Sequence, residues 1–146
     1  MNVAHRAHHD FEKEQTVRFL SIYKAVEPTT PPSPEHMAKM QKLVEDALNA
    51  GWLLATEGCL PTAMGARVRR SGDKVTVIDG PFTGSKEVTG GFAILKAGSK
   101  AEAIELTKTF LALAGDGECE VRQIFTPTDE ETSCMAAELT EQFARA

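Results

Sequence analysis

The side chains best suited to metal binding gather near the start of the chain. His5, His8, His9 and Asp10 lie close together in a polar stretch, residues 1–15, that shows neither a strand nor a helix period. No further ligands follow at the fixed spacing that a zinc site needs. We therefore expect a flexible extension ahead of the domain, and no metal site.

Motifs for nucleophilic or cofactor chemistry are absent from the sequence. Cys59, Cys119 and Cys134 are widely spaced and form no C-x-x-C pair, which predicts packing roles in a reducing compartment. The sequence has no G-x-S-x-G elbow, P-loop or H-E-x-x-H motif, and its single Gly-Gly pair before Phe92 is too short for a dinucleotide site. We therefore expect no cofactor.

The run Asp79-Gly80-Pro81-Phe82 is the most distinctive local feature. Asp79 ends a predicted strand, and its carboxylate can accept hydrogen bonds from the amides of the following turn. Gly80 can take a backbone conformation closed to other residues, and Pro81 restricts it further. Phe82 is predicted to anchor the turn in the core or in a dimer interface. This reading, as a strand-ending turn, competes with one in which the run forms the wall of a pocket.

Hydrophobic periodicity and caps predict the elements that hold this turn. Ser33-Pro34 opens a first helix and Gly51 ends it, with His36 solvated in its first turn. Ser99 with Glu102 opens a second helix as a capping box. Strands are predicted over residues 17–23, 52–56, 66–70, 74–78, 91–96 and 118–125, and a short helix after Pro127.

This order of elements predicts an α+β fold, a ferredoxin-like sandwich with an inserted β-hairpin. Two helices can cover only one face of a sheet. Trp52-Leu53-Leu54-Ala55 and Phe92-Ala93-Ile94-Leu95 are nevertheless continuously apolar, as strands buried on both faces are. Because closed two-fold dimers are the commonest oligomers, we expect a homodimer with its sheets face to face.

The longest match to a known family is Val77-Ile78-Asp79-Gly80-Pro81-Phe82-Thr83-Gly84-Ser85-Lys86-Glu87, followed by Gly90-Gly91-Phe92. It resembles the YCII-related proteins of the DGPF type, whose pattern is DGPF, two residues, Ser or Thr, Lys and Glu, then a glycine entering a strand. Supporting matches are Ser33-Pro34-Glu35, Gly51, Glu57-Gly58 with Pro61, and Glu120-Val121-Arg122. The resemblance covers residues 16–126 and leaves 127–146 as a C-terminal helix. Gly84 departs from it, because relatives commonly carry Glu there.

The resemblance implies a dimeric α/β-barrel type of fold, and a candidate pocket formed by Glu57, Asp79, Phe82, Lys86, Glu87 and Arg122. A carboxylate beside a lysine in a partly buried cleft can transfer protons, and an arginine can hold an anionic substrate oxygen through paired hydrogen bonds. Lys86 and Glu87 point to opposite sides if the chain is extended there, and Arg122 can equally be a rim residue of a strand. Some relatives are proposed to use a His–Asp pair, but no histidine lies in the predicted strands.

The charge balance indicates which partners the chain avoids. Lys and Arg number 16 against 21 Asp and Glu, for a net charge of −5, so we expect no nucleic acid and no anionic membrane as a partner. No apolar run approaches the roughly 20 residues of a membrane helix, and the N-terminus does not resemble a signal peptide. We expect a cytoplasmic protein.

Three functions remain open at this level. The first is a dimeric small-molecule-binding or regulatory domain, since some DGPF-type relatives are associated with extracytoplasmic-function sigma factors. The second is a cofactor-independent enzyme acting on a small aromatic or phenolic compound by acid/base chemistry, since relatives with this fold include such enzymes. The third is a structural or interaction protein. Fold does not imply function, so the sequence identifies no ligand, substrate or regulatory partner.

Overall fold

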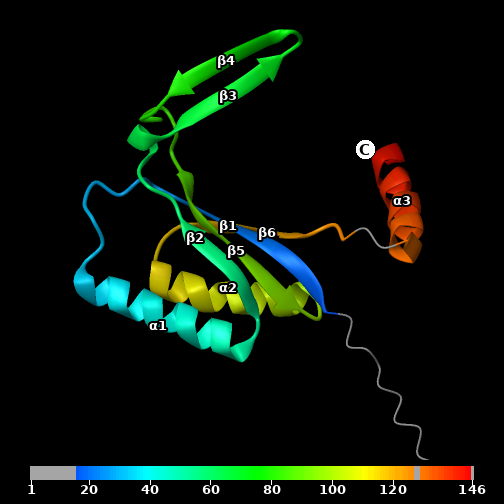
Figure 1. The fold of residues 1–146 in the computed structure, drawn as a ribbon, viewed down its shortest axis with the longest axis horizontal. Helices are drawn as coiled ribbons and strands as arrows, with labels where there is room; N and C mark the ends of the chain where they lie inside the picture. The colour runs from blue at the N-terminus through cyan, green and yellow to red at the C-terminus, as the bar shows by residue number, and fades with distance from the viewer. Residues whose placement is uncertain (1–15, 127–128, 146) are drawn as a thin grey trace, which may run out of the picture.

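The computed structural model describes residues 16–126 and 129–145 of the chain (Figure 1). It contains helices and antiparallel sheets, which confirms the predicted α+β class. The histidine cluster of the first ten residues lies outside the described part. In chain order the elements are β1 (Val17–Ala25), α1 (Pro34–Ala50), β2 (Leu53–Gly58), a 3-10 turn (Thr62–Met64), β3 (Ala66–Ser71), β4 (Lys74–Asp79), β5 (Val88–Ala97), α2 (Lys100–Ala114), β6 (Glu118–Gln123) and α3 (Asp129–Ala144).

The main sheet has four strands in the order β2-β5-β1-β6, and all its neighbours run antiparallel. β5 begins at Val88, earlier than predicted, because β1 continues to Ala25 and supplies its partner. β6 ends at Gln123 instead of residue 125, although just beyond it Ile124 N still donates a hydrogen bond to Arg18 O at 2.8 Å.

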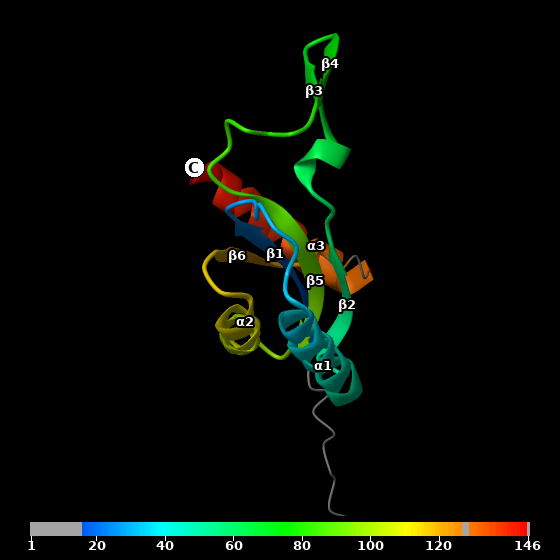
Figure 2. The same ribbon diagram turned by 90° about the vertical axis from the view of Figure 1, so that its left-hand side faces the viewer.

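Both main helices form where their caps predict them, and both cover the same face of the sheet (Figure 2). Ser33 Oγ accepts a hydrogen bond from His36 N at 3.1 Å, and Gly51 ends α1 with a φ of 83°, a left-handed conformation that favours glycine. Ser99 Oγ caps α2 in the same way. The carboxylate of Glu102 reaches back to Gly98 N at 2.9 Å, one residue before the partner that a reciprocal capping box uses.

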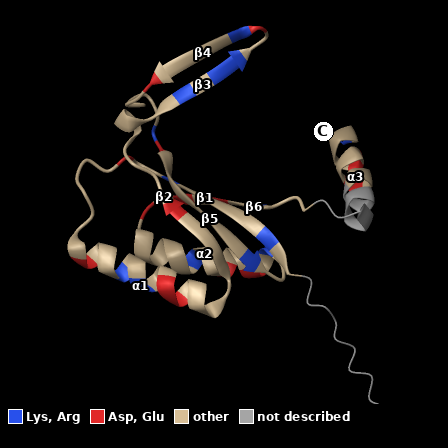
Figure 3. Cartoon of the chain, viewed as in Figure 1, with Lys and Arg blue, Asp and Glu red and all other residues tan. Residues whose placement is uncertain are grey.

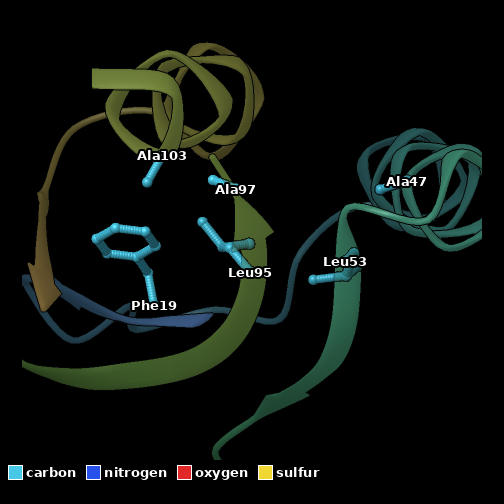
Figure 4. Packing of buried hydrophobic residues seen from close by; sticks show 6 residues of the cluster. All are labelled: Phe19, Ala47, Leu53, Leu95, Ala97 and Ala103. Carbon is cyan, nitrogen blue, oxygen red and sulfur yellow. The ribbon is translucent and has the colours of Figure 1, made fainter. Parts of the chain in front are cut away.

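The core lies between these helices and the sheet (Figure 4). Phe19 and Leu95 pair across β1 and β5 and pack beneath α2, while Leu53 packs beneath α1. Its other buried members are all small: Ala47, Ala97 and Ala103. Since each buried Phe or Leu side chain contributes about 1.5–3 kcal/mol, three large side chains provide most of the apolar burial here. The layer is thinly filled, and this leaves room for a cavity.

The opposite face of the sheet is apolar, and no residue that the structure describes covers it. Leu20 faces Ile94 and Ile22 faces Phe92 across β1 and β5, and these four side chains share one face because strand side chains alternate. Phe92 remains 37% exposed and Leu54, on the edge strand, 45%. The continuously apolar stretches therefore do bring apolar side chains to both faces of the sheet. The homodimer that was inferred from them stays a prediction.

β3 and β4 form a separate two-stranded hairpin that projects away from the main sheet, as Figures 1 and 2 show. The predicted hairpin is confirmed, with one more residue in each strand. α3 stands apart from the sheet and from the other helices in Figure 1, and no α3 residue from 136 to 144 belongs to the core.

Candidate functional site

The Asp79–Phe82 run forms a tight loop at the base of the hairpin. Gly80 N donates a hydrogen bond to Gly65 O at 2.9 Å, which brings the backbone after β4 against the turn before β3. A Cβ atom at Gly80 would overlap the carbonyl of Thr62, so any other residue would push these two segments apart. The glycine of the run is therefore required by close backbone approach.

Thr62, not Asp79, organises this loop. Thr62 donates from its backbone N and from its Oγ1 to the two carboxylate oxygens of Glu27, each at 2.7 Å, and Thr62 Oγ1 accepts from Phe82 N at 3.1 Å. These donated hydrogen bonds lower the pKa of Glu27 below its ordinary value. Asp79 is exposed, and among the described residues no hydrogen bond reaches its carboxylate. The predicted role of Asp79 as the hydrogen-bond hub is therefore wrong.

Phe82 is half-buried and lies outside the core, so its predicted anchoring in the core is also wrong. Its ring instead carries the guanidinium of Arg67 at 3.9 Å from the ring centroid. Arg67 also donates to Ser85 Oγ at 3.2 Å. Arg67 thus connects β3 to the loop beyond β4. The other reading of Phe82, as part of a dimer interface, stays a prediction.

The remaining candidate residues are scattered over the surface. Lys86 and Glu87 are exposed in the loop before β5, and no ion pair joins them in the part of the chain that the structure describes. Glu87 lies near the end of β1. The hydrogen bond to Glu120 is the main cause that raises the pKa of Lys24, and burial is the main cause for Tyr23, while the charge of Glu87 contributes least to both. Arg122 is exposed on β6 opposite Leu20, and so it lies on the uncovered face of the sheet.

A cavity of about 590 Å³ lies on the other side of the sheet, between the strands and helices α1 and α2. Its wall is mostly apolar, with Met40, Leu43, Trp52, Leu106 and Phe110 among the residues that line it. Of the six candidate residues from the sequence, only Glu57 lines this cavity. The predicted group of residues is therefore divided between the hairpin base, the loop before β5, the uncovered face and the cavity.

The polar side chains of the cavity wall are Ser21, Tyr23, His36, Gln41, Thr56, Glu57, Thr107 and Cys119. Several of them already have partners: Tyr23 Oη donates to Asp116 O at 2.9 Å, and Thr107 Oγ1 donates to Ala103 O at 2.8 Å. Burial is the main cause that raises the pKa of Tyr23, and it also raises the pKa of the Cys119 thiol. Cys119 is therefore a neutral thiol near pH 7, which makes it a poor nucleophile.

His36 is the cavity residue that sequence reasoning missed, since it was interpreted as solvated. It is half-buried and lines the cavity, as Glu57 does. A signal for this position was present in the sequence, because His36, Met40, Leu43 and Ala47 follow one another at helical spacings of four and three. Because His36 belongs to this stripe, its side chain faces the space between α1 and the sheet, as the apolar members do.

Gly91 explains the glycine pair that precedes Phe92. A Cβ atom at Gly91 would lie 2.6 Å from Glu57 O, so the glycine allows β2 to approach β5 closely beside the cavity. The pair therefore has a packing role, which the geometry accounts for without a ligand.

Neither a metal centre nor a membrane span is found in the described ranges. No three His, Cys, Asp or Glu side chains of residues 16–126 and 136–145 come together as metal ligands would. Within the same ranges no helix combines the length and the apolar character needed to cross a bilayer.

Comparison with known proteins identifies the family. The model of the YCII-related domain matches residues 17–128, from the first residue of β1 to just before α3. No curated protein matches the chain significantly. The matched region contains the whole main sheet, the two helices that cover it, the hairpin and every residue of the cavity wall. The chain belongs to the YCII-related domain family.

Proposed function

We propose that this protein is a dimeric small-molecule-binding domain of the DGPF type that holds an apolar ligand between its sheet and its helices. The cavity of about 590 Å³ is the observation that carries the proposal. Ligand pockets typically measure about 300–1,000 Å³ and combine an apolar wall with a few placed polar groups. Trp52 and Phe110 favour a flat, ring-containing molecule, and His36 and Glu57 can bind a polar substituent on it.

The finer architecture fits this proposal. The chain order β1-α1-β2-β5-α2-β6, with the sheet order β2-β5-β1-β6, follows the ferredoxin-like plan with the β3–β4 hairpin inserted between β2 and β5. In a dimeric α/β-barrel arrangement, the uncovered sheet faces of two copies pack on each other. Cys59 and Cys119 carry free thiols, which suits a reducing, cytoplasmic setting.

Thermal unfolding with a panel of small aromatic and phenolic compounds tests the ligand site. A compound that binds only the folded protein raises its melting temperature by several degrees at about 100 times its dissociation constant. Met40→Trp places a larger side chain in the cavity and should reduce this shift. Met64→Trp is the matched control, because Met64 is 73% exposed and does not line the cavity. Equal ligand-induced shifts in both variants would rule out the cavity as the site.

Sedimentation tests the dimer separately. We expect the wild-type chain to be a dimer at micromolar concentration, because Leu20, Ile22 and Phe92 present an apolar surface that a monomer would leave in water. Ile22→Glu, in the middle of that surface, should give a monomer. Leu48→Glu serves as the control, since Leu48 is 47% exposed on α1, which covers the opposite face. A monomeric wild type would overturn the dimer and leave the ligand test valid.

A cofactor-independent acid/base enzyme is the second candidate, and it is favoured by one observation: His36 and Glu57 line the same cavity. Such a pair can take a proton from a bound phenol and return it elsewhere on the ring. Prolonged incubation of each stabilising compound with the protein distinguishes the two functions. A binding domain returns the compound unchanged, whereas an enzyme alters it at a rate that His36→Gln lowers. If no compound in the panel stabilises the protein and the dimer remains, the chain is an assembly protein.

A further inference from the structure

We propose that α3 of one copy packs across the β3–β4 hairpin of a second copy, so that the two copies exchange these arms. The proposal rests on the homodimer proposed above and goes beyond it, because it assigns a role to the two elements that lie outside the packed domain. α3 also lies beyond the residues that the family model matches.

The hairpin has an apolar face that nothing in the described part of its own chain covers. Val68 and Val77 are cross-strand partners, and Val75 follows Val77 on the same face because strand side chains alternate. Their side chains are 70%, 63% and 59% exposed, respectively. A single two-stranded hairpin is only marginally stable in water, so this valine face requires a cover.

α3 carries a matching apolar face. Leu139 and Phe143 are four residues apart, which places them on one side of the helix, and they are 43% and 78% exposed. α3 has 16 residues, only just more than the length of about 12–15 residues below which isolated helices are marginal in water. Packing on an apolar surface would therefore stabilise it.

The two elements have net charges of opposite sign, and Figure 3 shows the basic segments on β3 and near the tip of the hairpin. The hairpin carries four basic side chains and two acidic ones: Arg67, Arg69, Arg70 and Lys74 against Asp73 and Asp79. Of the basic ones, Arg70 lies on the valine face, and the other three lie on the opposite face. α3 carries five acidic residues and no basic one: Asp129, Glu130, Glu131, Glu138 and Glu141. This opposition attracts α3 to the hairpin, whereas the chain outside these two elements carries a net charge of −2 and does not attract it.

The topology directs α3 to a second copy. The hairpin precedes Val88, which pairs with Ala25 at one end of β1, whereas β6 ends at Gln123, opposite Phe19 near the other end. Six residues along β1 separate these levels, a distance of roughly 20 Å. The chain therefore leaves β6 at the end of the sheet that lies away from its own hairpin. When two sheets pack face to face with their strands running in opposite directions, the partner's hairpin comes to the end from which α3 leaves.

Hydrogen exchange of the hairpin amides in the full-length dimer tests the exchange of arms. In the wild type, amides of residues 66–79 should be protected. Phe143→Glu should speed their exchange at least about tenfold and leave β1 and β5 unaffected. Ala137→Glu is the matched control, because it adds the same charge on the side of the helix that faces away from Leu139 and Phe143. Unprotected hairpin amides in the wild-type dimer, or no change with Phe143→Glu, would overturn the proposal and leave the dimer standing.

A mixing experiment distinguishes a second copy from the same copy. Isotope-labelled Phe143→Glu chains have an intact hairpin, and unlabelled Val77→Asp chains have an intact α3. If α3 docks on the partner, mixed dimers restore protection to the labelled hairpin. If α3 docks within its own chain, the labelled hairpin stays unprotected at every mixing ratio, and the proposed exchange is wrong.

Discussion

The two sheets of this chain have similar sequence patterns and opposite surroundings. In the main sheet, Phe19 and Leu95 are 2% and 3% exposed, because α1 and α2 lie over them. In the hairpin, Val68 and Val77 pair just as regularly and are 70% and 63% exposed. A run of β-branched and apolar residues thus predicts a strand in both places, but only the helices decide which strand holds the fold together. We expect stability to reside in the main sheet, and the hairpin to depend on the contacts at its base and on the cover by α3 proposed above.

The largest effect should come from the main sheet. Leu95→Ala removes a core side chain beneath α2 and should lower the free energy of unfolding by about 2–5 kcal/mol, since it adds a cavity to a layer that already contains one. Leu60→Ala is the control, because Leu60 is 72% exposed and its loss should change stability by no more than about 0.5 kcal/mol. Urea unfolding measures both. Similar losses in the two variants would contradict the contrast between core and periphery.

The base of the hairpin should show the next largest effect. Thr62→Val keeps the shape of the side chain and removes the hydroxyl that joins Glu27 to Phe82. We expect the Phe82 amide to exchange about tenfold faster, because the hydrogen bond that protects it is lost. Thr76→Val, on β4, should leave it unchanged, since the Thr76 hydroxyl only makes a 3.5 Å contact with Arg69 O. An unchanged Phe82 amide in Thr62→Val would show that the loop is held by other contacts.

The parts of the fold that depend on local chemistry could be predicted from the sequence. Ser33 and Gly51 bound α1 because a cap and a left-handed residue act on their own neighbours. The alternation in β3 and β4 predicted the hairpin for the same reason. The link between Glu27 and Thr62 spans 35 residues and follows no period, so no local pattern could predict that it holds the loop.

The candidate site was harder to predict, because a motif indicates a backbone shape more directly than a reaction. The Asp79–Phe82 run marks the loop correctly, and Gly80 is needed there for close approach to Thr62. The cavity, however, lies beneath the helices, and its only member from the predicted group is Glu57. His36 could have been included from its helical spacing to Met40. Its position in the first turn of α1 favoured the solvated interpretation instead.

Acid should weaken the hairpin base through Glu27. The pKa of Glu27 is lowered in the folded protein, so the stability it contributes is fully present above its ordinary value of 4.5. This contribution is lost as the pH falls through the lower folded pKa. Wild type should therefore lose stability more steeply than Glu27→Gln below about pH 4.5, and the curves should run parallel at higher pH. Glu45→Gln, on α1, is the control, and urea unfolding across the acid range measures all three. If the unfolding free energies of wild type and Glu27→Gln stay parallel over the whole pH range, the two hydrogen bonds from Thr62 do not lower the pKa of Glu27 in the folded protein.

The smallest effect should come from Arg67, which joins β3 to the loop beyond β4. Arg67→Lys keeps the charge but loses the flat guanidinium that lies 3.9 Å from the centroid of the Phe82 ring, so the cost should be about 0.5–1 kcal/mol. Arg69→Lys makes the same change two residues along the same face of β3 and should cost less, because Arg69 has no aromatic partner among the described residues. Equal losses of unfolding free energy in the two variants would mean that the Arg67–Phe82 ring contact adds no stability beyond that of the positive charge, which lysine keeps. A larger cost for Arg67→Lys would show that the hairpin, although it lacks a core of its own, is joined to the domain by side chains at its base.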